Sequence, residues 1–162
     1  MPNSNPGNNL LLVAGPTGSG KSLFAASLAS RVRGEIVCGD AFQLYRGLAV
    51  LTAQPGEALL RMAPHHLYGI LDPAEPCDAA AYARRARAVC AEIRRRGNRP
   101  VVVGGSGLYL RALVHGFHEF PPPDPALREE LNRETPEALA TRLLSLDPGS
   151  ASRVDLKNPW RV

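Results

Sequence analysis

Cysteine, lysine and long hydrophobic runs are all scarce in this sequence of 162 residues. Its cysteines, Cys38, Cys77 and Cys90, form no closely spaced pair and leave one over, which disfavours a disulfide framework or a zinc site. No apolar run approaches the roughly 20 residues of a membrane helix. The first residues also lack the basic stretch followed by an apolar stretch that is typical of a secretory signal. We therefore expect a cytoplasmic protein with no membrane association.

Positive charge is in modest excess and comes almost entirely from arginine. The formal net charge is +4, and only Lys21 and Lys157 among the 19 basic residues are lysines. A basic balance suits a polyanionic partner such as nucleic acid. Genomic base composition also replaces lysine by arginine, so the charge alone leaves both explanations open.

Short apolar segments that alternate with helical patterns predict a parallel α/β sheet flanked by helices. Strands are expected at 10–14, 35–39, 65–71 and 100–105, and helices after the first strand, at 78–97 and at 107–115. Residues 40–64 are predicted to form a loop with one helical turn at 57–62. The expected organisation is a disordered arm (1–9), the α/β core (10–120) and a small helical appendage (121–162).

A phosphate-binding loop follows the first predicted strand. The residues Gly15, Pro16, Thr17, Gly18, Ser19, Gly20, Lys21 and Ser22 match the pattern G-x-x-x-x-G-K-[ST]. Glycines let backbone N–H groups turn toward phosphate oxygens, and the following helix N-terminus and the ammonium group of Lys21 add positive charge. The hydroxyl of Ser22 is a candidate Mg²⁺ ligand. The motif predicts a site for a diphosphate-like group and leaves the reaction open.

Two further polar residues follow predicted buried strands. Asp40 comes after the strand at 35–39, and Ser106 follows Gly104-Gly105 at the end of the strand at 100–105. Carboxyl ends of parallel strands form the edge where open sheets bind ligands. Asp40 is therefore a candidate base, with a loop or cap carboxylate as the alternative, and Ser106 is either a site hydroxyl or part of a tight turn.

Several segments together resemble one family. They are GPTGSGKS, GDAFQLYRGLAVLTAQP (39–55), PHHLYGILDP (64–73), VVVGGSGLYLRAL (101–113) and PPPDPALR (121–128). In order and wording they are similar to the tRNA dimethylallyltransferases, over nearly the whole chain from Leu10. The resemblance implies a P-loop core like that of nucleotide kinases. It also implies transfer of a dimethylallyl group from dimethylallyl diphosphate to N6 of adenosine 37 in tRNA.

The same resemblance implies roles for single residues. Asp40 becomes the general base, Ser106 a hydroxyl beside the reacting centre, and the phosphate loop the holder of the diphosphate with Mg²⁺. The implied tRNA contacts are Asp40, Ala41, Phe42, Gln43, Ser106, Arg128 and Arg161. The family usually has serine where Ala41 stands and threonine where Ser106 stands, and the segment around Arg161 departs further.

The family normally continues well beyond Val162, so we expect this sequence to lack a C-terminal part, and we expect a monomer. Three alternative functions remain open: a small-molecule kinase that uses ATP, an adenylate isopentenyltransferase, and an inactive tRNA-binding fragment. The strand at 100–105 ends without the carboxylate that a kinase needs. Arginines between 84 and 99 are interpreted as a solvated helix face, with a phosphate-backbone contact as the alternative, and His65 and His66 as structural residues.

Overall fold

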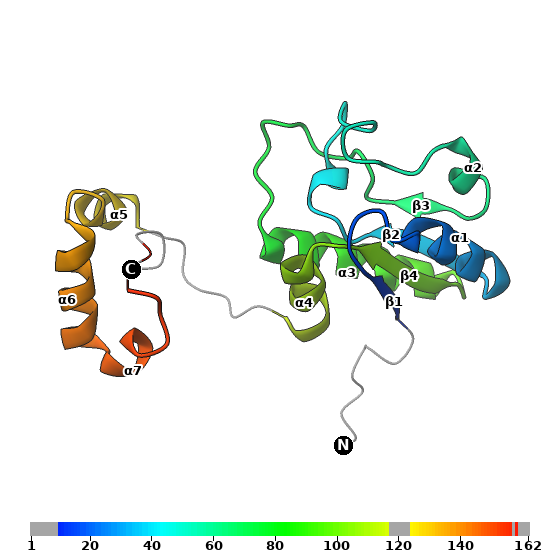
Figure 1. Ribbon diagram of the computed structural model, residues 1–162. Helices are drawn as coiled ribbons and strands as arrows, with labels where there is room; N and C mark the ends of the chain where they lie inside the picture. Colours follow the sequence, from blue (N-terminus) through cyan, green and yellow to red (C-terminus); the bar gives the residue numbers. More distant parts are fainter. Residues whose placement is uncertain (1–9, 117–123, 157, 159–162) are drawn as a thin grey trace, which may run out of the picture. The chain divides into compact units, whose positions relative to one another are not determined.

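The structure, a computed structural model, describes residues 10–116, 124–156 and 158 (Figure 1). The chain divides into two units, residues 1–117 and 118–162. The predicted arm at 1–9 lies outside the described residues. Within the described ranges, no helix is long and apolar enough to cross a membrane.

The first unit is built on a sheet of four parallel strands in the order β1-β4-β2-β3. The strands are β1 Leu11–Ala14, β2 Gly34–Cys38, β3 His65–His66 and β4 Arg99–Gly104. In the centre of the sheet, Val101 of β4 lies opposite Leu11 of β1 on one side and Ile36 of β2 on the other. The predicted parallel α/β fold is confirmed, and the carboxyl ends of β1, β2 and β4 share one edge.

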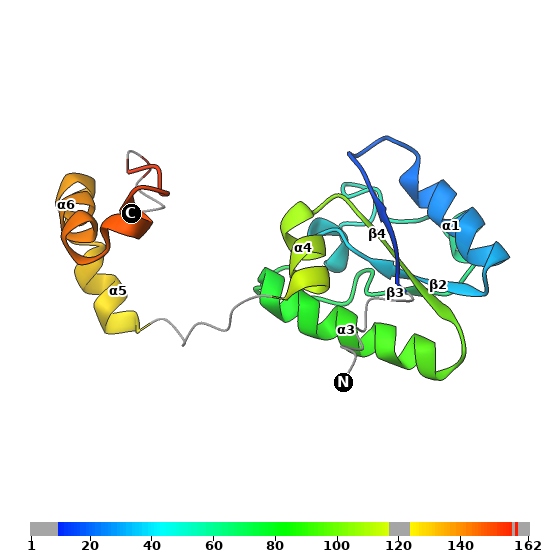
Figure 2. The ribbon, with the colours of Figure 1, turned by 90° about the horizontal axis from the view of Figure 1, so that it is seen from below.

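Helices cover both faces of this sheet (Figure 2). On one face α1 Lys21–Arg31 packs small side chains, including Ala25 and Ala29, against Ile36 and Val101. On the other face α3 Ala79–Arg95 and α4 Gly107–His115 pack against Val37, Cys38 and Val102. Successive residues of β4 therefore alternate between two separate cores, with Val101 and Val103 in one and Val102 in the other, as expected for a strand buried on both faces.

The segment between β2 and α3 departs in two places from the sequence prediction, which expected one helical turn, at 57–62, and a strand at 65–71. It contains the short helices η2 Phe42–Leu44 and α2 Glu57–Leu60. The strand expected at 65–71 ends at His66, apart from an isolated bridge between Tyr45 and Leu71. The reason is backbone geometry: Leu67 and Gly69 adopt positive φ angles of 68° and 60°, which extended strands cannot accommodate.

The second unit consists of helices in its described part, as predicted. They are α5 Pro125–Leu131, α6 Pro136–Leu146 and α7 Pro148–Ala151. Each helix begins with proline after a capping side chain, supplied by Asp124, Thr135 and Asp147 in turn. Arg142 of α6 pairs with Glu134 at 2.8 Å and with Glu130 at 3.4 Å, which links α6 to the end of α5.

Glu35 of β2 is a buried carboxylate, with 3% of its surface exposed. It accepts hydrogen bonds from Arg96 Nη2 at 2.7 Å, from Asn98 Nδ2 at 2.8 Å and from His66 Nε2 at 2.6 Å. The hydrogen bond with Arg96 is the main reason why the pKa of Glu35 falls to about 2, against the opposing effect of burial. His66 therefore has a structural partner. Its neighbour His65 has one as well, because its Nδ1 lies 2.8 Å from the carbonyl oxygen of Ala63.

Most arginines of and after α3 are exposed, as expected for a solvated helix face. Several nevertheless have defined partners. Arg85 pairs with Glu75 at 2.9 Å, and Arg87 donates to the carbonyl oxygens of Ala112 and Leu113 at the end of α4. Together with Arg96, these side chains stabilise the fold of the first unit.

Candidate active site at the carboxyl edge of the sheet

The phosphate loop connects β1 to α1 at the carboxyl edge. Gly18 and Gly20 have φ angles of 80° and 77°, a conformation that strains any residue with a Cβ atom. The carbonyl oxygen of Pro16 accepts hydrogen bonds from Ser19 Oγ at 2.8 Å and from Lys21 Nζ at 3.1 Å. Through these bonds the side chain of Lys21 folds back toward the start of the loop. This geometry suits an anion at the helix N-terminus.

Gly105 is the point where three segments of the edge meet. A Cβ atom on Gly105 would lie 3.2 Å from the carbonyl oxygen of Gly15 in the phosphate loop and 3.6 Å from Asp40 Oδ2. At Gly104 a Cβ atom would collide with the backbone of Gly39. The two glycines therefore allow the turn after β4 to pass between the phosphate loop and Asp40, and they bring both within reach of one ligand.

Asp40 is half-buried directly after β2. Its Oδ1 accepts a hydrogen bond from the backbone N–H of Phe42 at 3.1 Å, which fixes the carboxylate within its own turn. The other oxygen, Oδ2, is the one near Gly105. The carboxylate therefore has one oxygen that orients it and one directed toward the neighbourhood of the phosphate loop.

Ser106 joins the turn after β4 to the segment that carries Asp40. Its Oγ accepts a hydrogen bond from the backbone N–H of Ala41 at 2.8 Å, and its own N–H lies 3.4 Å from the carbonyl oxygen of Gly39. Because the hydroxyl acts as an acceptor toward Ala41, its proton remains able to donate to a ligand. Ser106 therefore links the turn after β4 to the segment that carries Asp40.

Four of the predicted tRNA contacts are consecutive: Asp40, Ala41, Phe42 and Gln43. Phe42 is 70% exposed, an unusual position for an aromatic ring. Gln43 is half-buried, and its Nε2 donates to the carbonyl oxygens of Thr52 and Ala53 at 2.8 and 3.0 Å. These two hydrogen bonds could not be predicted from the sequence, since nothing in the spacing of residues 43 and 52–53 indicates a contact.

A magnesium ion, which the family resemblance implies, could be held by few protein groups here. Within the described parts of the chain, no group of three or more His, Cys, Asp or Glu side chains could hold a metal ion. The half-buried hydroxyl of Ser22 lies in the first turn of α1, next to Lys21. Magnesium often uses one or two protein ligands and completes its shell with phosphate oxygens and water. The donor set therefore fits Mg²⁺ that arrives with a diphosphate.

Two further predicted tRNA-binding residues, Arg128 and Arg161, fall in the second unit of the chain. Arg128 lies on α5 of the second unit and is exposed. Arg161 lies outside the described residues. Tyr109 is buried on α4, where its ring stacks on that of Tyr82 with centroids 4.6 Å apart. This aromatic pair belongs to the core between α3 and α4.

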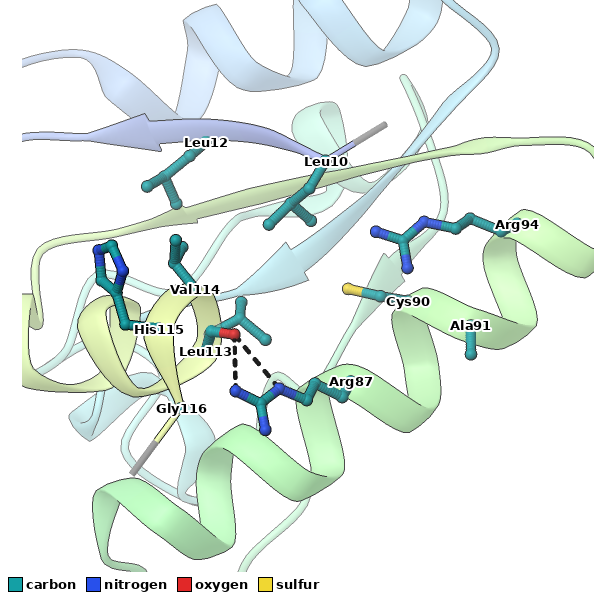
Figure 3. A pocket seen from close by; sticks show the side chains of 10 residues that line it. All are labelled: Leu10, Leu12, Arg87, Cys90, Ala91, Arg94, Leu113, Val114, His115 and Gly116. Atoms are coloured by element: carbon teal, nitrogen blue, oxygen red, sulfur yellow. Dashed lines mark hydrogen bonds between the residues drawn. The ribbon is translucent and has the colours of Figure 1, made fainter. Parts of the chain in front are cut away.

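A hollow of about 770 Å³ lies elsewhere in the first unit, between the start of β1, α3 and the end of α4 (Figure 3). Its lining consists of Leu10, Leu12, Arg87, Cys90, Ala91, Arg94, Leu113, Val114, His115 and Gly116. Among the described residues, Arg94 Nε is buried without a hydrogen-bond partner. No residue of the phosphate loop lines the hollow, nor does Asp40 or Ser106, so it is separate from the candidate active site.

Comparison with protein families gives a match to the model described as IPP transferase, over residues 43–162. Among individual proteins, a tRNA dimethylallyltransferase of Anaeromyxobacter dehalogenans is 49% identical over 157 residues, and one of Halorhodospira halophila is 47% identical. Each alignment covers 94% of this chain but only 52% and 51%, respectively, of the relative. The chain thus spans about half the length of these relatives.

Solved structures of two related proteins resemble the fold. The tRNA isopentenylpyrophosphate transferase of Bacillus halodurans matches with a TM-score of 0.68 at 35% identity, over 94% of this chain and 52% of that one. A eukaryotic dimethylallyltransferase acting on tRNA matches with a TM-score of 0.83 at 25% identity, over 94% of this chain and 39% of that one. The predicted fold class, a P-loop NTPase-like sheet, is confirmed by these similarities.

Proposed function

The chain belongs to the IPP transferase family, and we propose that it transfers a dimethylallyl group from dimethylallyl diphosphate to N6 of adenosine 37 in tRNA. The observation that carries this proposal is the meeting of the phosphate loop, Asp40 and Ser106 around Gly105. Such an edge offers an anion site beside a carboxylate and a hydroxyl. A transfer that releases diphosphate and removes a proton from an amine needs this combination.

The diphosphate would lie in the phosphate loop. Backbone N–H groups from Thr17 to Ser22 and the N-terminus of α1 would stabilise its negative charge, and Lys21 would add a full positive charge. The hydroxyl of Ser22 would hold Mg²⁺. When bound, the metal neutralises charge on the departing diphosphate.

The chemistry joins a poor nucleophile to an allylic carbon. The N6 nitrogen of adenosine forms a bond to C1 of the dimethylallyl group while the bond from C1 to the diphosphate oxygen breaks, and the electron pair leaves with the diphosphate. N6 then carries one proton too many, and Asp40 accepts that proton. Oδ2 is the oxygen available for this step, because Oδ1 already accepts from the N–H of Phe42.

The tRNA would contact residues on both units. Near the reacting centre these are Asp40, Ala41, Phe42, Gln43 and Ser106, and farther along the chain Arg128 and Arg161. The exposed ring of Phe42 offers a surface on which a base can stack, a contact worth about 1–3 kcal/mol. Arg128 offers a charge for a phosphate group. The cytoplasm is the compartment that we propose for this reaction.

Lys21→Ala is expected to weaken the binding of dimethylallyl diphosphate by roughly 1.5–3 kcal/mol, the range for a hydrogen bond to a charged group. The variant removes the one ammonium group of the loop and leaves its glycines in place. Isothermal titration calorimetry measures the effect. Arg31→Ala is the control, because it removes an exposed positive charge from the far end of the same helix, α1. Equal affinities for Lys21→Ala and the wild type would contradict the role of the loop.

Ser106→Ala is expected to slow transfer by about 10²-fold, since a positioned donor is worth most as charge develops on the leaving oxygen. Affinity for tRNA should change far less. The substitution also leaves the N–H of Ala41 without its acceptor, so Ser106→Thr, which keeps the hydroxyl, serves as the matched variant. Single-turnover rates and tRNA binding are measured side by side. An equal loss in rate and affinity would reduce Ser106 to a docking contact.

One assay separates the proposed function from its alternatives. Radiolabelled dimethylallyl diphosphate is offered to the protein with unmodified tRNA, with AMP or with no acceptor, and ATP hydrolysis is measured in parallel. We expect label in tRNA alone. Label in AMP would indicate an adenylate isopentenyltransferase, and ATP turnover without prenyl transfer would indicate a kinase. Binding of tRNA without transfer of label would indicate a tRNA-binding module.

A further inference from the structure

Two glutamine side chains, Gln43 and Gln54, hold each other's backbone segments. Gln54 Nε2 donates to the carbonyl oxygen of Gln43 at 3.0 Å and to that of Tyr45 at 2.9 Å. In the opposite direction, Gln43 Nε2 donates to the carbonyl oxygens of Thr52 and Ala53 at 2.8 and 3.0 Å. We call this set of four hydrogen bonds the glutamine clamp.

The chemistry of the clamp fixes the orientation of both amide groups. Each Nε2 faces two carbonyl oxygens, which can only accept hydrogen bonds, so an amide oxygen could not replace the nitrogen in either place. Both N–H groups of each side chain are consequently used within the protein. Of the Gln43 side chain, only Oε1 remains for a ligand, and it can only accept a hydrogen bond.

The clamp ties a tight loop to the segment that carries Asp40. The loop bends at Gly47 with a φ angle of 76°, and Ala53 has a φ angle of 52°, which is strained for a residue with a side chain. On its other side the segment is tied by the N–H of Gly69, which donates to the carbonyl oxygen of Gln43 at 3.0 Å. The Gln43 carbonyl oxygen therefore accepts two hydrogen bonds, one from Gln54 Nε2 and one from the N–H of Gly69, which tie the segment on both sides.

We propose that Gln54 is a positioning residue, which acts by immobilising the segment from Asp40 to Tyr45 and so fixes Asp40 and Gln43 for the acceptor. The effect of Gln54 on catalysis rests on the proposed function above. Gln54 acts through backbone carbonyl groups and has no direct part in the chemistry. What the segment needs from residue 54 is a donor that reaches two carbonyl oxygens, and this requirement defines the test.

Three variants of Gln54 separate the effect of its hydrogen-bond donors from the effect of its side-chain volume. Gln54→Leu removes the donors and keeps most of the volume, and Gln54→Glu turns acceptors toward the two carbonyl oxygens. Gln54→Lys restores a donor group on a chain long enough to reach both. Thr52→Val is the matched control, because it removes only the Thr52 hydroxyl, which donates to the carbonyl oxygen of Leu48 at 2.8 Å, and leaves the backbone carbonyl that accepts from Gln43 in place.

Two readouts are taken on the natural full-length chain. Hydrogen exchange of peptides that cover residues 41–46 reports the mobility of the segment, whose backbone N–H groups bond to Asp40, Ser106 and Leu71. Steady-state kinetics report kcat and the KM for dimethylallyl diphosphate. In Gln54→Leu and Gln54→Glu we expect exchange to accelerate about tenfold and kcat to fall roughly 10- to 100-fold, with that KM unchanged.

The decisive comparison is whether lysine at position 54 restores what leucine removes. Gln54→Lys should return exchange and kcat close to the wild-type values, whereas Thr52→Val should leave both nearly unchanged. The proposal is overturned if Gln54→Leu exchanges at the wild-type rate in 41–46, or if Thr52→Val loses as much transfer as Gln54→Leu. A wild-type protein without any prenyl transfer would refute the proposed function. In that case, faster exchange in Gln54→Leu with rescue by lysine would still support the immobilising role of Gln54.

Discussion

Asp40→Asn is expected to slow dimethylallyl transfer by roughly 10²- to 10⁴-fold while tRNA still binds, the range typical of a lost general base. Asparagine has the same shape and keeps the oxygen that accepts from the N–H of Phe42, so the turn should survive the change. What disappears is the charge on the oxygen near Gly105. Single-turnover transfer with protein in excess, measured beside tRNA affinity, checks the expectation.

The first unit contains a matched control for this substitution. Asp72 is exposed and makes the same kind of local contact, its Oδ1 accepting from the N–H of Ala74 at 3.1 Å. Asp72→Asn should leave the rate unchanged. If Asp40→Asn were equally harmless, Asp40 would be only a turn carboxylate, because asparagine accepts a backbone hydrogen bond about as well as aspartate.

Glu35→Gln is expected to have the largest effect on stability, lowering the free energy of unfolding by roughly 2–4 kcal/mol. The carboxylate is buried and accepts charge-assisted hydrogen bonds from Arg96 and His66 and a further bond from Asn98. A neutral amide presents a donor to groups that also donate. Urea unfolding followed by circular dichroism gives the difference. Glu57→Gln, which breaks an exposed pair with Arg61, is the control and should cost under about 1 kcal/mol.

The same carboxylate predicts how stability depends on pH. The pKa of Glu35 is about 2 in the folded protein, below the ordinary value of 4.5, so its contribution is fully present above pH 4.5 and disappears as pH falls toward 2. By proton linkage this contribution amounts to about 3 kcal/mol. Between pH 4.5 and 2, unfolding free energy should decline more steeply in the wild type than in Glu35→Gln. If the unfolding free energies of the wild type and of Glu35→Gln changed with pH in the same way, the assigned role of Glu35 would be wrong.

The parts of the fold that the sequence predicts are those governed by local patterns. Apolar runs such as Val101–Val103 mark strands buried on both faces, and the glycines of the phosphate loop mark a turn that needs positive φ angles. Because parallel strands share an edge, the sequence could also predict that Asp40 and Ser106 lie close to the phosphate loop. Their meeting at Gly105 follows from strand order, which places β4 between β1 and β2.

Contacts between side chains and distant backbone could not be predicted in the same way. Gln43 and Gln54 have no periodic relation, and their clamp exists only because the loop turns back on itself. Glu35 has the polarity of a surface residue, yet Arg96 and Asn98 arrive from the far end of α3 and compensate its burial. The overextended prediction at 65–71 has a similar cause, because an apolar sequence does not reveal the positive φ angle of Leu67.

The most direct test of the central claim is the chemical identity of the product formed on tRNA. Unmodified tRNA is incubated with the natural full-length protein, Mg²⁺ and dimethylallyl diphosphate, then digested and analysed by mass spectrometry of nucleosides and of sequence-specific fragments. We expect N6-dimethylallyladenosine at position 37, with release of one diphosphate per modified tRNA and none with Asp40→Asn in the same time. Unmodified adenosine at position 37 after complete incubation, or a dimethylallyl group on another nucleoside, would contradict the account.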